Sequence, residues 1–157
     1  MAQPPKVLDV YNKWSKFSFG KRLFSWFFAQ WAPYFKTIKP LVLDLEPGKC
    51  EVLIKKKKAV QNHIGTVHVI AICNGLEMAM GACAEATIPE HLRWIPKGMT
   101  LDYTAKAGSD IRCVADCRDM IWQEGDFLMP VTAYDKNDVV VVKGHIKLWV
   151  SLKPNKK

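Results

Sequence analysis

Residues 69–86 read VIAICNGLEMAMGACAEA, and this stretch decides the fold. It is long and largely apolar, and its glycine and alanine residues let neighbouring backbone come close. A helix that is hydrophobic on nearly all sides is typical of a protein interior. The sequence therefore predicts a buried helix over residues 69–86, around which the rest of the chain packs.

Glu77 stands in the middle of this apolar segment. An ionised carboxylate is costly to bury without a partner, so a carboxylate kept there is a candidate for function. A solvent-facing Glu77 on a half-exposed helix is the alternative, which the apolar neighbours disfavour. Glu85 lies near the polar end of the segment, and we expect it to face solvent.

Two helices and a hairpin are predicted before this segment. Apolar side chains at near-helical spacing indicate one helix over residues 7–19, ended near Gly20, and a second over residues 21–32, ended by Pro33. From Thr37 onward the pattern alternates, and the turn signal Pro47-Gly48 joins two strands.

Four strands are predicted after the central segment, separated by turn signals and forming an antiparallel meander. They cover residues 93–105, 111–120, 127–134 and 139–152. The pattern predicts an α+β protein with a helical extension over residues 1–36, a body over 37–153 and a basic tail over 154–157.

Composition narrows the class of protein. The chain has 157 residues, of which 49% are hydrophobic and 24% charged, which fits one globular domain and excludes disordered and collagen-like chains. No apolar run approaches the roughly 20 residues of a membrane span, and the first ten residues do not resemble a signal peptide. We expect a cytoplasmic protein.

The five cysteines have no paired spacing, so free thiols are expected rather than a disulfide framework. Cys113 and Cys117 should lie on the buried face of a strand. They lack further ligands nearby for zinc, and no metal site is predicted.

The formal net charge of +8 favours an anionic partner: nucleic acid, phospholipid head groups or a phosphorylated small molecule. Basic residues cluster at 55–58 and in the C-terminal tail. Such clusters are commonly solvated strand ends, so charge alone does not choose among these partners.

A polar segment, residues 61–68, leads into the central helix. Unpaired N–H groups and the positive end of the helix dipole at a helix start can stabilise a carbonyl oxygen that gains charge during acyl transfer. Asn62 could bind a water or a carbonyl, and Gly65 would allow a substrate to approach closely. For His63 and His68, capping or core hydrogen bonding is the simpler role.

The motif Asn62-x-Ile64-Gly65-Thr66-Val67-His68, followed by Glu77 and by the segments 98–100 and 105–110, resembles the hotdog-fold acyl-CoA thioesterases, particularly the phenylacetate-pathway type. The likeness covers residues 41–152. It implies a hotdog fold: a long central helix wrapped by an antiparallel sheet, here with a two-helix extension like that of an uncharacterised thioesterase-like branch.

The resemblance also implies roles for particular residues. Asn62 would position water or the thioester, the backbone amide of Val69 after His68 would polarise its carbonyl, and Glu77 would act as general base or nucleophile. The family's His-Gly-Gly is His68-Val69-Ile70 here. Side chains at the two former glycine positions narrow the approach of a substrate to the backbone amides of Val69 and Ile70. Gly65 and Thr66 are retained.

Coenzyme A would enter as part of the substrate, with no further cofactor. Its binding is assigned to Thr66 and His63, and its phosphates to the basic side chains Lys56, Lys58, Arg93, Lys97 and Lys106. The resemblance implies a homodimer or a dimer of dimers, with Asn62 and Glu77 supplied by different chains.

Three alternatives stay open. A hotdog hydroxyacyl dehydratase would pair His63 with Glu77, although the Pro-Gly before its helix is absent. A non-catalytic acyl-CoA or lipid binder would use the aromatic N-terminal helices as a lid, which leaves weak membrane contact open. Nucleic-acid binding is suggested by charge alone, without a recognition motif, and we do not expect it.

Overall fold

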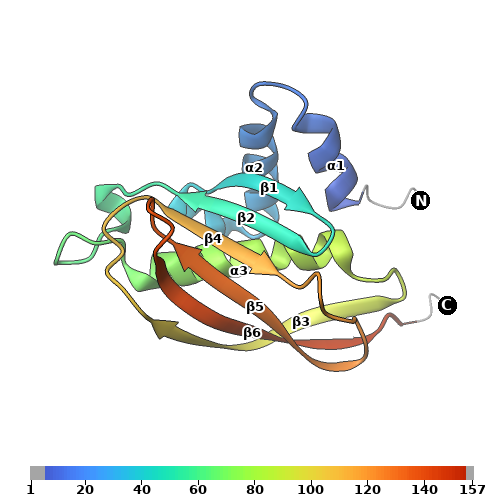
Figure 1. The fold of residues 1–157 in the computed structure, drawn as a ribbon. Helices are drawn as coiled ribbons and strands as arrows, with labels where there is room; N and C mark the ends of the chain where they lie inside the picture. Colours follow the sequence, from blue (N-terminus) through green and yellow to red (C-terminus); the bar gives the residue numbers. More distant parts are fainter. Residues whose placement is uncertain (1–5, 155–157) are drawn as a thin grey trace.

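The computed structural model describes residues 6–154 and places one long helix inside the curve of an antiparallel sheet (Figure 1). In chain order the elements are α1 Val7–Trp14, α2 Gly20–Trp31, the 3₁₀ helix η1 Pro33–Ile38, β1 Leu41–Glu46, β2 Lys49–Ile54, the 3₁₀ helix η2 Lys58–Val60, α3 Val69–Thr87, β3 Leu92–Tyr103, β4 Ile111–Asp116, β5 Gly125–Tyr134 and β6 Val140–Leu152. The predicted order of helices and strands is confirmed, and so is the α+β class.

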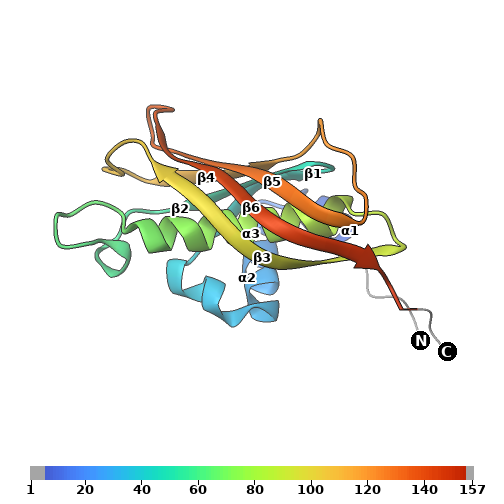
Figure 2. The same cartoon turned by 90° about the horizontal axis from the view of Figure 1, so that it is seen from below.

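The six strands form one sheet in the order β1-β2-β4-β5-β6-β3, with every neighbouring pair antiparallel. The predicted meander of the last four strands is therefore wrong for β3, which pairs with β6 at the sheet edge instead of with β4. Thr87, the last residue of α3, accepts a hydrogen bond from the Gly48 N–H in the β1–β2 turn at 2.7 Å, and the strand that follows adds to the opposite edge of the sheet. Figure 2 shows β3 beside β6 along this edge.

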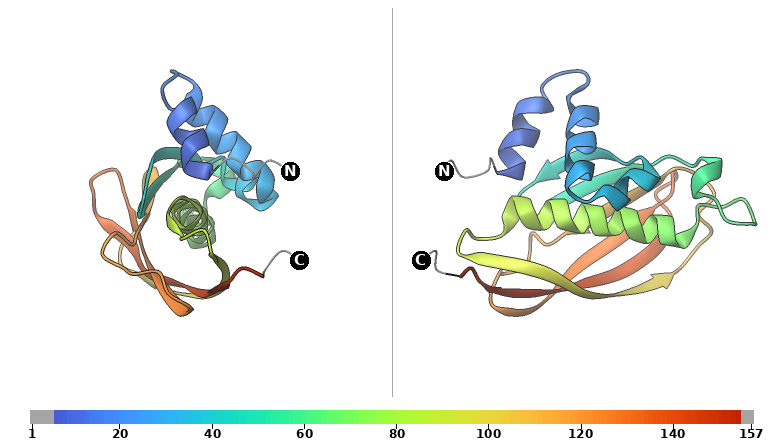
Figure 3. Two further views of the ribbon diagram at one scale, coloured as in Figure 1. Left: turned by 90° about the vertical axis from the view of Figure 1, so that its right-hand side faces the viewer. Right: turned by 180° about the vertical axis from the view of Figure 1, so that it is seen from behind.

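α3 fills the concave side of the sheet, seen end-on in the left view of Figure 3. Leu76, Met78 and Met80 on this helix are buried, as are the facing strand residues Ile54 and Ile111. Within residues 6–154 α3 is the one helix long and apolar enough to cross a membrane, but 61% of its most apolar 18-residue stretch is buried inside the fold. It is the core helix that the apolar segment predicted.

The N-terminal helices pack against β1 and share the core of the sheet (Figure 1). Phe24 is fully buried, with its ring edge-on to Tyr11 at 5.1 Å between centroids. The buried Ser25 Oγ accepts a hydrogen bond from the Val42 N–H at 2.8 Å and donates to the Lys21 carbonyl at 2.6 Å. These contacts fix α2 on the edge of β1.

Two predicted boundaries are wrong near the N-terminus. The first helix ends at Trp14 and not at residue 19, because the backbone turns so tightly that a Cβ on Gly20 would lie 1.5 Å from the Trp14 carbonyl oxygen. Thr37 lies in η1 and not in a strand, and Lys39, with a φ of 47°, reverses the chain before β1.

Strand β4 ends at Asp116, four residues before the predicted limit, because its partner β2 begins at Lys49 opposite Asp116. Cys117 therefore follows the strand but is buried as expected. All five cysteines are free thiols, and the Cys83 and Cys117 sulfurs lie 3.8 Å apart. Residues 155–157 of the predicted tail and residues 1–5 of the predicted extension lie outside the described residues.

Candidate active site

A cavity of about 540 Å³ opens at the N-terminal end of α3, between the loop before the helix, the end of β3 and the start of β6. Several predicted site residues, from the loop before α3, lie in its lining. The other walls come from segments that are distant in the sequence. The lining residues are Asn62, His63, Ile64, Thr66, Val67, His68, Val69, Ile72, Tyr103, Thr104, Ala105, Lys106, Ala107, Val141 and Val142.

The loop before α3 is held by the side chain of Asn62. Its Oδ1 accepts hydrogen bonds from the Ile64 N–H at 3.2 Å and the Thr66 N–H at 3.1 Å, and its Nδ2 donates to Thr66 Oγ1 at 2.8 Å. A carboxamide oxygen has two acceptor sites and the NH₂ group two hydrogens. Asn62 therefore keeps one N–H for a ligand, and both acceptor sites of its oxygen are already used.

His68 is the N-cap of α3, as its position before the helix suggested. Its Nδ1 accepts a hydrogen bond from the Ile70 N–H at 3.1 Å, so the neutral ring carries its proton on Nε2. The cap thereby uses one of the free N–H groups at the helix start. The ring is exposed at the cavity, where Nε2–H can donate to a ligand.

Val69 is the first residue of α3 and lines the cavity. Within the part of the chain that the structure describes, its N–H donates to no protein acceptor, whereas His68 N–H, Ile70 N–H and Ala71 N–H all do. An unused N–H at the positive end of a 19-residue helix favours an oxygen that carries negative charge. The backbone amide that the resemblance pointed to is therefore available.

Three other predicted residues have different positions in this loop. His63 is exposed and lines the cavity, and Thr66 Oγ1, which accepts from Asn62, retains its own hydrogen for a ligand. Gly65 does not line the cavity. Its φ of 74° is in the left-handed region, so the turn favours glycine at this position, and a Cβ there would meet nothing within 4 Å.

Glu77 is half-buried on the open face of α3, and not enclosed as its apolar neighbours suggested. Among residues 6–154 no side chain forms a hydrogen bond or an ion pair with it. The expected partner is thus missing within one chain. Eight residues of helix place its Cα about 12 Å along the axis from Val69, and it is not among the residues that line the cavity.

The open face of α3 also carries Ile70 and Cys73, which precede Glu77 by seven and four residues. Burial raises the pKa of the Cys73 thiol, and the Glu77 carboxylate adds to this shift. The helix face on which Glu77 lies is therefore only partly covered in a single chain. Glu85 is exposed as expected, and it accepts a hydrogen bond from Trp94 Nε1 at 2.8 Å.

The basic side chains proposed for coenzyme A do not gather in one place. Lys106 lines the cavity, and Lys56 lies beside that segment because its Nζ donates to the Gly108 carbonyl at 3.0 Å. Lys58 begins η2.

Arg93 and Lys97 lie towards the opposite end of β3, in contacts of their own. Arg93 donates to Ser151 Oγ at 3.1 Å, and Lys97 pairs with Asp126 at 3.3 Å. These two residues cannot serve the cavity of their own chain.

Sequence reasoning missed the far wall of the cavity, formed by Tyr103, Thr104, Val141 and Val142. Tyr103 pairs with Val142 across β3 and β6. These residues enter the site only through that strand pairing, which no local pattern in the sequence signals. Among residues 6–154, no three histidine, cysteine or acidic side chains are grouped to hold a metal.

Comparison with known proteins gives the family. The sequence pattern of a family described as a domain of unknown function, DUF4442, matches residues 20–150. The chain belongs to the DUF4442 family. The crystal structure of the structural-genomics protein APC5556 is 41% identical to this DUF4442 protein over 94% of this chain and 99% of its own, with a TM-score of 0.83. None of the curated proteins matches.

More distant solved structures share the fold of this DUF4442 protein. One is a Pseudomonas aeruginosa protein described as a probable thioesterase, with 20% identity, a TM-score of 0.73 and coverage of 80% of this chain and 91% of its own. Another is a thioesterase family protein from Silicibacter pomeroyi, with 15% identity, a TM-score of 0.69 and coverage of 87% and 100%. The hotdog fold expected from the motif is thus confirmed.

Proposed function

We propose that the protein hydrolyses the thioester of an acyl-CoA to a free acid and coenzyme A, and that it does so as a homodimer or a dimer of dimers. The observation that carries the proposal is the unused Val69 N–H at the start of α3, in a cavity of about 540 Å³. The fold, shared with proteins described as thioesterases, supports the same activity.

The proposed role of the cavity is to hold the thioester carbonyl. Its oxygen would accept from the Val69 N–H, and the remaining Asn62 N–H or the Thr66 hydroxyl would supply a second donor. Both groups are already oriented by the Asn62–Thr66 hydrogen bond. Fixed donors aimed at a developing oxyanion each contribute roughly 10²–10³ to the rate.

The carboxylate in this proposal comes from a second copy of the chain. Glu77 lies along α3 from its own cavity, so the Glu77 that activates water, or attacks the carbonyl, belongs to the other subunit. When water attacks, the coenzyme A thiolate leaves and the free acid is released directly. When Glu77 attacks, the thiolate leaves and a mixed anhydride forms on Glu77, which water then hydrolyses to the free acid and the restored carboxylate. Because Asn62 has no acceptor site to spare, it cannot serve as the base itself.

The free edge of β3 is the proposed contact between the two copies. β3 is 12 residues long and pairs only with β6 among the described strands. Met99 and Tyr103 lie opposite the buried Ile146 and Val142, hence on the α3 side, yet they are 38% and 63% exposed. Antiparallel pairing of β3 with its copy would cover these side chains and the open face of α3.

Coenzyme A phosphates are assigned in this proposal to Lys106 and Lys56, the two proposed lysines beside the cavity. No additional cofactor is invoked, because water is the second reactant. We also propose the cytoplasm as the site of action, where five free thiols would stay reduced.

The test is release of free thiol from a panel of short, long and aromatic acyl-CoAs. We expect wild-type protein to release coenzyme A, and Glu77→Gln to lower the rate by about 100-fold or more. Glu85→Gln on the same helix is the matched control, because a glutamine retains an oxygen for Trp94 and its rate should stay near wild type. The protein's own thiols are measured without substrate and subtracted.

Two results would contradict the proposal. One is a folded wild-type protein that releases no thiol from any acyl-CoA in the panel. The other is saturable binding of acyl-CoA, measured by calorimetry, that Glu77→Gln leaves unchanged while no thiol appears. That second result would assign the protein to non-catalytic acyl-CoA binding.

A further inference from the structure

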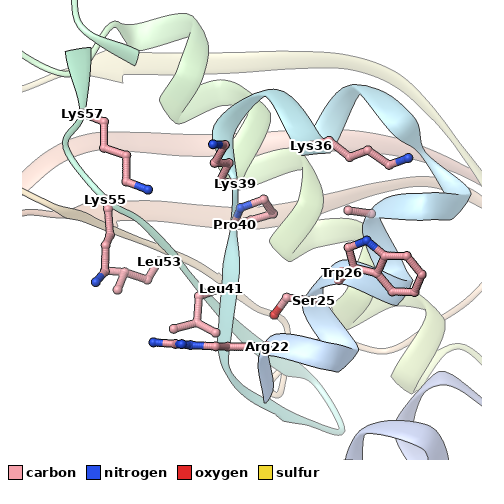
Figure 4. Close-up of a pocket in the computed structure, with 11 residues that line it drawn as sticks. Arg22, Ser25, Trp26, Lys36, Lys39, Pro40, Leu41, Leu53, Lys55 and Lys57 are labelled. Carbon is pink, nitrogen blue, oxygen red and sulfur yellow. The ribbon is translucent and has the colours of Figure 1, made fainter. Parts of the chain in front are cut away.

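A second large concavity, the basic groove, lies between α2, η1 and the strands β1 and β2 (Figure 4). Its volume is about 500 Å³, close to that of the cavity at α3. Five of its lining side chains are basic and none is acidic. The basic residues are Arg22, Lys36, Lys39, Lys55 and Lys57.

The charge of the basic groove is not neutralised by the protein. Among residues 6–154, none of its five basic side chains forms an ion pair. Over residues 6–40 the chain has seven lysine and arginine residues and one acid, Asp9. Several like charges around one concavity produce a positive potential that attracts anions.

One wall of the groove is apolar and continues outside it. Trp26 lines the groove and is 62% exposed. Leu23 precedes Trp26 by three residues on α2 and is 49% exposed. Phe19, the N-cap residue of α2, precedes Trp26 by seven residues, accepts a hydrogen bond from the Leu23 N–H at its carbonyl, and is 72% exposed, so all three side chains lie on one side of the helix. We call these three residues the apolar ridge. The opposite face of α2, with Phe24 and Phe28, is buried in the fold.

We infer that the apolar ridge and the basic groove together bind the surface of an anionic phospholipid bilayer. The ridge enters the boundary between head groups and acyl chains, where tryptophan and phenylalanine are favourable, and the groove binds head-group phosphates. A soluble phosphorylated ligand would fill the groove and leave Phe19 and Leu23 in water. A bilayer covers both features at once, which favours it.

This inference is independent of the proposed hydrolysis, because neither the ridge nor the groove includes a residue that lines the cavity at α3. Binding would be peripheral and reversible. An amphipathic face with few inserted side chains binds weakly, and its affinity depends on anionic lipid and on salt.

The test is co-sedimentation with phosphatidylcholine vesicles that contain either no anionic lipid or about 30% phosphatidylserine. We expect the wild-type protein to bind the anionic vesicles at least about tenfold more strongly, and raised salt to release it. Two double variants test the two features: Leu23→Ser with Trp26→Ala for the ridge, and Lys55→Glu with Lys57→Glu for the groove. Each should weaken binding by about tenfold or more.

Matched controls lie elsewhere on the surface. Ile121, which is 84% exposed, is replaced by serine, and the exposed Lys136 and Lys153 are together replaced by glutamate, which changes the net charge as much as the groove variant does. Both variants should bind anionic vesicles as the wild type does, which separates a local surface from the general positive charge.

The inference is overturned if the folded wild-type protein does not sediment with anionic vesicles, or if the ridge variant binds them as tightly as wild type. A second overturning result has three parts. The wild-type protein binds single-stranded RNA at the same salt concentration, the groove variant does not bind it, and neither protein binds vesicles. The groove would then be a nucleic-acid site.

Discussion

At the start of α3, the N–H of Val69 can be removed without unfolding the helix. Val69 is the first helical residue, a position that tolerates proline because its N–H has no partner within the helix. The preceding His68 has φ −62° and ψ 133°, the extended conformation that proline requires of its neighbour. Val69→Pro should therefore fold and still lower kcat for acyl-CoA by about 10²–10³.

Val69→Ala is the control for this substitution, because alanine also shortens the side chain but keeps the N–H. Its kcat should remain within a few-fold of wild type, with circular dichroism confirming the fold of both variants. Equal activity of the proline and alanine variants would exclude the Val69 amide from the reaction.

The hydrogen bonds of Asn62 show which features of a single residue can be predicted from the sequence. Its hydrogen bonds go to residues two and four positions later, so they are local and belong to a recognisable class of asparagine turn. The motif singled out Asn62, and the structure places this residue in the lining of the cavity. The sequence pattern did not reveal that the loop uses most of its hydrogen-bonding capacity.

Among the elements, β3 provides the proposed contact between two copies, on which the proposed site depends. A long edge strand with exposed apolar side chains on its inner side favours pairing with another chain. Met99→Lys places a charge on that inner side, where a second copy would have to bury it. We expect the protein to change from dimer to monomer by light scattering, and thiol release from acyl-CoA to fall with it.

Ile121→Lys provides the comparison for the β3 variant. It adds the same charge at a side chain that is 84% exposed and outside every strand, so mass and activity should stay at wild-type values. A wild-type protein that is monomeric and active would contradict the shared site directly.

The sequence predicted which segments form helices and strands better than it predicted which strands pair in the sheet. The apolar segment that became α3 and the alternating strands are local patterns, and their order along the chain was predicted correctly. The pairing of β3 with β6 depends on how the curved sheet closes around α3, which is a property of the whole fold. The cavity wall formed by Tyr103 and Val142 was missed for that reason.

For the whole molecule, burial of ionisable side chains should make the free energy of unfolding fall at alkaline pH. Cys50 and Cys113 are fully buried, and burial raises the pKa of both thiols well above the ordinary value. Burial, with Asp44 nearby, also raises the pKa of Tyr11 to about 12. In the unfolded chain these groups ionise at their ordinary pKa values, near 8.5 for cysteine and near 10 for tyrosine.

A group whose pKa is higher in the folded state stabilises the fold below its unfolded pKa, and this contribution is lost as pH rises towards the folded value. The free energy of unfolding should therefore be nearly constant below about pH 8 as far as these groups are concerned. Above about pH 9 each buried thiol should lower it by about 1.4 kcal/mol per pH unit, and Tyr11 should add to the slope above about pH 10.

Urea unfolding between pH 8 and pH 11, followed by tryptophan fluorescence with a reductant present, measures this slope. Cys50→Ala creates a small cavity and should lower stability at every pH, but it should also make the alkaline slope shallower by the contribution of one thiol. The difference in slope, rather than in absolute stability, identifies the buried thiol as the cause. Parallel slopes for the variant and wild type would mean that Cys50 ionises as readily in the folded protein as in the unfolded chain.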